Sequence, residues 1–138
     1  MRTLAVRQPW ATLIAEGTKS IEVRSWKTDY RGEILIVASG RPMKIENVDG
    51  QMETLPSQVF VCTVTLLDCR LIEAEDLTGA CCDICPGEEY AWVLANPRHV
   101  LPKPHKGKLN LYSTPDEEIE YLPEDEHYLD HVADFRAR

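Results

Sequence analysis

The chain has 138 residues, of which 43% are hydrophobic and 28% are charged, and this composition is typical of one folded domain and excludes a wholly disordered chain. No apolar run approaches the roughly 20 residues that a membrane-spanning helix needs, and the stretch MRTLAVRQPW lacks the apolar core of a signal peptide. We therefore expect a cytoplasmic protein without a membrane partner, and five cysteines, an odd number, agree with a reducing compartment.

The net charge of −8 is concentrated near the C-terminus. Residues 114–138 hold nine acidic residues and two arginines, a net −7, whereas residues 1–44 hold eight Lys or Arg and four Asp or Glu, a net +4. A basic N-terminal part can accept a polyanion, and an acidic tail can contact a protein partner or lie across a basic cleft. The sequence therefore predicts a domain over residues 1–113 and an acidic C-terminal tail over residues 114–138.

The predicted elements follow from hydrophobic periodicity and from turn residues. In chain order they are a strand at 3–6, a helix at 8–17, strands at 20–26 and 33–39, a loop over 40–57, a long strand or a strand bent by a bulge at 58–72, an irregular insertion over 73–89, a strand at 90–100 that Asn96-Pro97 closes, and a strand at 107–113. Pro9 suits the first position of the early helix, and Gly17 suits the residue just past its end. Residues 33–39 are nearly all apolar, so we expect a central strand that is buried on both faces.

Two helices are predicted in the acidic tail. Thr114 as the cap, Pro115 at the first position and Glu117 three residues after the cap are typical of a helix start, and a second helix is possible over residues 124–135. Five or six short strands with one early helix indicate an α+β, mainly β fold, namely a small β-barrel or curved sheet with an acidic C-terminal helical tail.

The stretch GTKSIEVR contains Gly17, Lys19, Glu22 and Arg24 at the spacing G-x-K-x-x-E-x-R. With the flanking stretches RQPWATLIAEG, YRGEILIVAS, YAWVLANPR and KGKLNLYS, this string resembles the ASCH family of the PUA-like superfamily of small β-barrels. The resemblance covers about residues 2–113 and leaves the acidic tail outside.

The resemblance implies an RNA or modified-nucleoside ligand in a cleft between the barrel and the early helix, and no cofactor. It also leaves an enzyme open, because some relatives are amidohydrolases that act on 4-acetylcytidine and ribonuclease activity is associated with the family. In those amidohydrolases a threonine nucleophile stands three residues after the lysine, where this chain has Glu22. Ser20 is the hydroxyl nearest to Glu22, but its position differs from that of the threonine. Glu73 and Glu75 lie in the region that holds the relatives' catalytic acid, but no motif matches either one to it.

The four candidate ligand-binding residues are Lys19, Glu22, Arg24 and Trp26, of which Lys19 and Glu22 would be catalytic if the protein is an enzyme. Lysine donates three hydrogen bonds or acts as a base when desolvated. A carboxylate accepts from the exocyclic amine of cytosine, and arginine pairs with phosphate or stacks on a base. The alternative for these three residues is a surface ion pair.

Tryptophans, cysteines and histidines provide further candidates. Trp26 alternates with Glu22 and Arg24 and is the stacking candidate, whereas we expect Trp10 and Trp92 in the core. We expect no metal. Cys81, Cys82 and Cys85 include one C-x-x-C pair, but a structural zinc site needs four ligands. His127 and His131 are spaced for one helix face, yet they lie among acids that indicate a solvated tail.

Three functions remain open from the sequence. The first is an RNA- or modified-nucleoside-binding domain, the second is a small hydrolase that uses the same cleft, and the third is a protein-interaction domain whose acidic tail contacts the partner. Turnover that is lost in Lys19→Ala would separate the second function from the first.

Overall fold

The structure is a computed structural model that describes residues 1–82 and 88–133. Its main element is a curled sheet in the order β2-β7-β6-β3-β1-β8, and a separate hairpin is formed by β4 and β5. The strands are β1 (Arg2–Arg7), β2 (Ile21–Arg24), β3 (Gly32–Ser39), β4 (Met43–Glu46), β5 (Met52–Leu55), β6 (Val59–Leu71), β7 (Tyr90–His99) and β8 (Leu111–Ser113). The helices are α1 (Trp10–Ala15) and α2 (Leu77–Ala80), with short 3-10 helices η1 (Ala74–Asp76), η2 (Asp116–Glu118) and η3 (Tyr128–His131).

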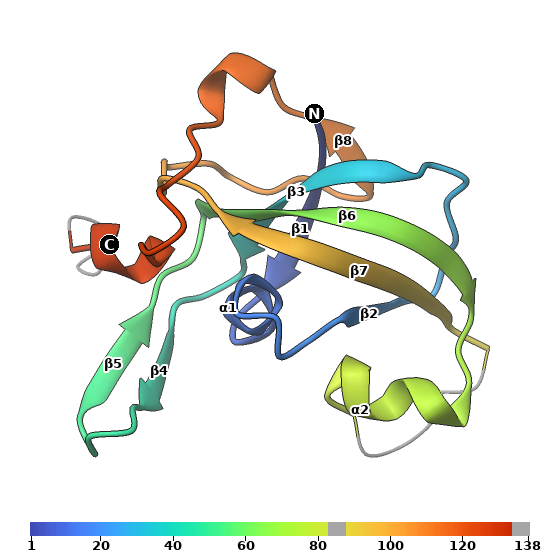
Figure 1. Cartoon of the computed structure of the whole chain (residues 1–138), viewed down its shortest axis with the longest axis horizontal. Helices are drawn as coiled ribbons and strands as arrows, with labels where there is room; N and C mark the ends of the chain where they lie inside the picture. The colour runs from blue at the N-terminus through green and yellow to red at the C-terminus, as the bar shows by residue number, and fades with distance from the viewer. Residues whose placement is uncertain (83–87, 134–138) are drawn as a thin grey trace.

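The sheet curls into a half-barrel around α1, as the sequence predicted for a small mainly-β fold. Figure 1 shows α1 at one end of the curled sheet, between the β4–β5 hairpin and α2. In β3, residues 34–38 are completely buried, which confirms the prediction of a central strand covered on both faces. Of the two forms expected for the long strand β6, the structure has the irregular one, because its register with β7 shifts at two places.

The order of the strands brings the two ends of the sheet toward one site. β1 lies next to β3 in parallel, and the chain then passes through α1 to β2 at the other edge of the sheet. The last strand, β8, pairs only with residues 2–4 of β1. The second half of β1 therefore has an unpaired edge that can face β2.

Four predicted elements differ in the structure. Residues 40–57, expected as a loop, contain the β4–β5 hairpin, because two four-residue strands fit between the glycines and prolines that indicated a loop. β7 continues through Asn96 and Pro97 instead of ending there, and Asn96 has a positive φ of 54° within the strand. β8 begins only at Leu111, and Leu109 is exposed. Pro9 is the N-cap of α1 rather than its first residue.

The C-terminal segment also differs from the predicted helices. Its first turn is the 3-10 helix η2, which begins at Asp116 after Pro115. Thr114 does not cap this turn, because its hydroxyl accepts a hydrogen bond from Thr3 in β1. The side chain of Tyr128 in η3 is completely buried in the main core, so this segment packs against the sheet and α1.

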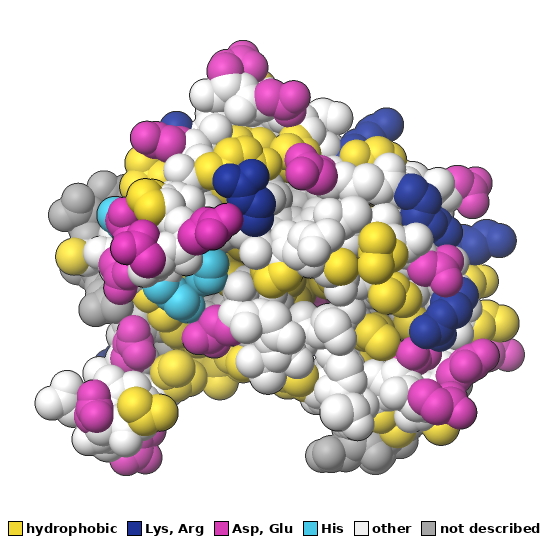
Figure 2. Space-filling model, in the orientation of Figure 1, with side chains coloured by type: hydrophobic (Ala, Val, Ile, Leu, Met, Phe, Trp, Pro, Cys, Tyr) yellow, Lys and Arg dark blue, Asp and Glu magenta, His cyan; other side chains and the backbone are white. Residues whose placement is uncertain are grey.

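Acidic side chains remain exposed over this segment. In Figure 2, Asp and Glu side chains gather at the top of the molecule, where η2 lies, and along the C-terminal segment. None of the described helices is long and apolar enough to span a bilayer. The described part of the acidic segment thus has a buried apolar side and an exposed charged side.

Candidate nucleic-acid interface

A pocket of about 820 Å³ opens where the free half of β1 meets β2. Its lining comes from the end of β1, the start of α1, the turn after α1, β2, the end of β3, α2 and the loop before β8. Among the described residues, its charged lining consists of four cations and one carboxylate, namely Arg7, Lys19, Arg24, Lys108 and Glu22. In a chain of net charge −8, this excess of positive charge is a local feature that attracts anions.

Glu22 lies between two cations on the floor of this pocket. Its Oε2 atom accepts hydrogen bonds from Nη2 of Arg24 at 2.7 Å and from Nε at 3.1 Å. Its Oε1 atom is 3.6 Å from Nζ of Lys19. The residues Lys19 and Glu22 are only 4% and 7% exposed, so the ion pair is buried, and the interpretation of these residues as a surface ion pair is wrong.

Alternation along β2 places Glu22 and Arg24 on one face, as predicted from the period of two. Arg24 also joins the two ends of the curled sheet, because its Nη2 donates to the backbone oxygen of Ala5 in β1 at 2.8 Å. β8 pairs with residues 2–4 of β1 and ends before Ala5, so the backbone oxygen of Ala5 can accept the bond from Arg24. Arg24 therefore closes the half-barrel at the pocket in addition to pairing with Glu22.

Lys19 is positioned by the turn after α1, by a backbone oxygen and by an aromatic ring. Gly17 has a φ of +80°, a conformation that glycine adopts at the end of a helix without strain, and the turn directs Lys19 back toward α1. Its Nζ donates to the backbone oxygen of Ala80 at 2.6 Å and lies 5.3 Å from the centre of the Trp10 ring. Because the ammonium already donates to a carbonyl, it is positioned as a cation and hydrogen-bond donor.

The structure reverses the expected roles of two tryptophans. Trp10, predicted in the core, is 40% exposed and lines the pocket. Trp26, predicted to stack on a ligand, does not line it. Instead Trp26 packs edge-on against the buried Trp92 ring, with centroids 4.8 Å apart. Among the described lining residues, Trp10 is thus the aromatic one, and the expected burial of Trp92 is confirmed.

Sequence reasoning also missed the contribution of distant segments. Arg7 is the last residue of β1, and Lys108 and Asn110 come from the loop before β8. Lys106 and Lys108 in the stretch HKGKLN were a detectable basic cluster, but only the fold places that stretch beside β1. Gly107 permits this approach, because a Cβ atom there would lie 2.8 Å from Cβ of Ala5.

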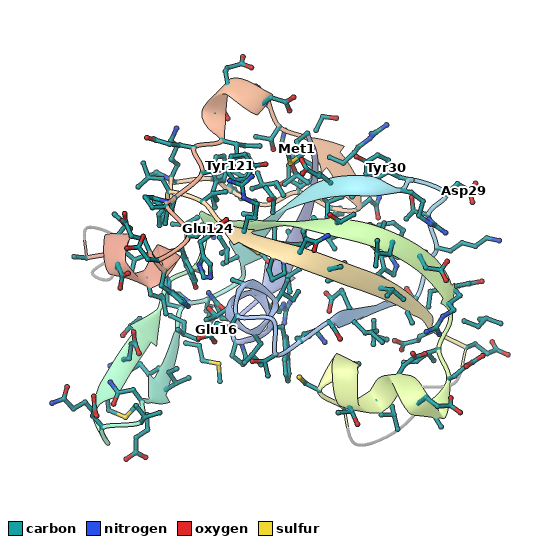
Figure 3. The ribbon with its side chains drawn as sticks, in the orientation of Figure 1. Met1, Glu16, Asp29, Tyr30, Tyr121 and Glu124 are labelled. Atoms are coloured by element: carbon teal, nitrogen blue, oxygen red, sulfur yellow. The ribbon has the colours of Figure 1, made fainter. Side chains whose placement is uncertain are left out.

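The other candidates from the sequence do not join this pocket. Ser20, Glu73 and Glu75 are exposed and do not line it. His127 approaches Glu16, at 3.4 Å, whereas His131 bonds to Glu126. Figure 3 shows Glu16 on the side of α1 that faces the C-terminal segment.

The described residues contain no group of three or more potential metal ligands. Of the clustered cysteines, Cys82 lines the pocket, Cys81 lies at the end of α2, and Cys85 lies outside the described residues.

A family model described as the ASCH domain matches residues 4–104. The chain belongs to the ASCH domain family. Activating signal cointegrator 1 of Mus musculus is 27% identical over 126 residues, which cover 79% of this chain and 21% of that protein. The protein of the same name from Homo sapiens has the same identity and coverage. The chain therefore spans about a fifth of the length of these curated relatives.

Solved ASCH structures have the same fold. A crystal structure of ASCH from Zymomonas mobilis matches with a TM-score of 0.61 at 14% identity, covering 85% of this chain and 89% of that one. A point mutant of that protein matches with a TM-score of 0.59 at 14% identity, covering 85% and 91%. At this identity the likeness extends to the fold, which confirms the PUA-like architecture expected from the sequence.

Proposed function

We propose that this ASCH domain binds RNA or a modified nucleoside in the pocket between β1 and β2. The observation that carries the proposal is a buried carboxylate between two cations on the floor of the pocket, with the exposed Trp10 ring beside them. Such a site offers a flat aromatic surface, hydrogen-bonding groups and positive charge in one cavity. These are the three features by which unpaired bases and their phosphates are held.

Glu22 is the group best placed to distinguish bases. Both bonds from Arg24 go to Oε2, and Oε1 is 3.6 Å from Lys19, which is longer than a hydrogen bond. Oε1 therefore keeps the capacity to accept from a ligand. A carboxylate accepts from amino groups but not from carbonyl groups, so the pocket would favour cytosine-like or adenine-like edges.

The geometry favours binding over hydrolysis. Lys19 donates a hydrogen bond to the Ala80 oxygen and is held by this contact as a donor. Among the described residues that line the pocket, none is a histidine, and Ser39 has the only hydroxyl. The hydroxyl of Ser20, which is the nearest to Glu22 in sequence, lies outside the lining. Lys19 and Glu22 therefore serve as binding residues in this proposal.

Replacing Trp10 with alanine tests the proposed stacking. Stacking of one base on an aromatic ring contributes about 1–3 kcal/mol, so Trp10→Ala should weaken binding of a cytidine-rich RNA by about 5- to 150-fold. The side chain is partly exposed, so the protein should remain folded. Equilibrium titration with a fluorescent RNA gives the dissociation constants.

Leu67→Ala is the matched control, because this exposed apolar residue of β6 lies outside the pocket. Its affinity should equal that of the unmodified protein. Equal affinities for all three proteins would remove Trp10 from the site. Release of RNA fragments, or of acetate from 4-acetylcytidine, that is abolished in Lys19→Ala would instead establish the hydrolase.

A further inference from the structure

A second pocket adjoins the first through the turn after β3. It has a volume of about 570 Å³ and shares Gly40 with the first pocket. The side chain of Arg7, which lines the first pocket, passes over this shared residue, because a Cβ atom on Gly40 would lie 3.5 Å from Cγ of Arg7. The two cavities are therefore neighbours, with Arg7 beside the residue that they share, and we call the two adjoining pockets together the groove.

The second pocket is basic, and none of the described residues that line it is acidic. Its charged side chains are Arg41, from the turn that leads into β4, and Lys106, from the loop before β8. Burial lowers the pKa of His105 and the nearby Lys108 acts in the same direction, although Glu118 opposes them. The imidazole is therefore neutral at pH 7, and Arg41 and Lys106 supply the positive charge.

The cations along the rest of the groove have no described acidic partner, unlike Lys19 and Arg24 on the floor of the first pocket. Glu22 neutralises part of the charge of Lys19 and Arg24. In contrast, no described carboxylate lies within ion-pair distance of Arg7, Arg41 or Lys106, and all three side chains are exposed. Unpaired cations aligned on a groove are a feature of surfaces that follow a phosphate backbone.

We infer that the ligand is a single-stranded oligonucleotide, which places one base in the first pocket and lays its following phosphates past Arg7 into the second pocket. This inference rests on the proposed function and extends it from a single nucleoside to a strand. A duplex does not meet these requirements, because its bases are stacked and paired and cannot enter a pocket unless they are flipped out. Sequence preference then comes from the first pocket and affinity for the backbone comes from the second.

The test compares two probes that occupy different parts of the groove. Cytidine 5′-monophosphate reaches only the first pocket, whereas a hexacytidylate RNA reaches both. In the double variant Arg41→Ala/Lys106→Ala, affinity for the hexamer should fall about tenfold at low salt, because two phosphate contacts are lost. The slope of log K against log salt should become shallower by about 1.4, at about 0.7 per phosphate on a single strand. Affinity for the mononucleotide should stay within about twofold, since rim charges that the ligand does not contact contribute little.

Arg2→Ala/Lys27→Ala is the charge-matched control, because both residues are exposed and line neither pocket. Its affinity for the hexamer should remain within about twofold of the unmodified protein, as expected for distant exposed charges.

Three results would overturn the inference. The first is an equal loss of affinity in the control. The second is binding of the mononucleotide as tightly as the hexamer, which would leave the proposed nucleoside site standing. The third is tighter binding of a polyglutamate peptide than of the hexamer through Arg41 and Lys106, which would indicate an acidic protein partner. If neither nucleotide probe binds the unmodified protein, the proposed function fails as well.

Discussion

Replacing Glu22 with alanine is expected to lower the free energy of unfolding by about 3–5 kcal/mol, the range for breaking a buried ion pair from one side. The carboxylate is the shared partner of Lys19 and Arg24. Without it, the buried ammonium of Lys19 keeps the Ala80 oxygen and the Trp10 ring but no described carboxylate as a partner, and a buried charge without an ion-pair partner lowers the stability of the folded state. Urea denaturation followed by circular dichroism measures the change.

Two variants make this result specific. Glu117→Ala removes an exposed acid of η2 and should change the stability by no more than about 0.5 kcal/mol. Replacing all three residues by apolar ones, in Lys19→Met/Glu22→Leu/Arg24→Met, should cost less than Glu22→Ala, because no charge is then left buried. A loss below about 1 kcal/mol in Glu22→Ala would contradict the buried arrangement.

The second large effect is expected at Tyr128, where alanine should lower the free energy of unfolding by about 3–5 kcal/mol, as for other large-to-small changes in a core. The ring is completely buried, and its hydroxyl contacts Thr12 of α1 and Gln8 just before it. Burial raises the pKa of this phenol to about 12, so the hydroxyl stays protonated. Tyr128 therefore fixes the helix that carries Trp10 to the pocket.

Thermal or urea unfolding of Tyr128→Ala can be compared with Glu124→Ala, an exposed acid of the same segment that Figure 3 labels. The control should be nearly neutral, since surface substitutions usually change stability by less than about 0.5 kcal/mol. Equal stabilities of the two variants would show that the segment does not pack as described. If the expected loss is found, deletion of residues 114–138 would remove part of the core. The effect of the negative charge of this segment on RNA binding must then be tested by substituting its exposed acidic residues.

The sequence predicted the elements that depend on local patterns. Alternation along residues 20–26 placed Glu22 and Arg24 on one face, and the apolar run at residues 33–39 indicated the buried central strand. The ASCH string identified the family because its residues lie close together in the chain. These features need only neighbouring residues, so periodicity and spacing are sufficient to find them.

The features that sequence reasoning missed depend on the curl of the sheet. The bond from Arg24 to Ala5 exists because β2 and β1, at separate positions in the sheet, approach each other when it curls. Trp10 was expected in the core since it shares a helical face with Ile14, but α1 is only six residues long and its first residue lies at the pocket rim. Lys108 reaches the site from a loop more than eighty residues away from Lys19.

The short hairpin and the C-terminal segment were missed for a different reason. In residues 40–57 the glycines and prolines indicated turns more strongly than two four-residue strands indicated a hairpin. At Thr114 the capping pattern was present, but the hydroxyl bonds to Thr3 across the sheet. A tertiary contact thus replaced the local one, as is common for weak local signals.

The most direct test of the account is a two-dimensional amide NMR titration of the protein with the hexacytidylate RNA. We expect the largest shift changes at residues that line the two adjoining pockets, including Trp10, Lys19, Arg24, Gly40 and Lys106. The β4–β5 hairpin tip and η2 should not change, because neither lines the groove. Changes confined to those two segments, or none at millimolar RNA, would contradict a nucleic-acid site between β1 and β2.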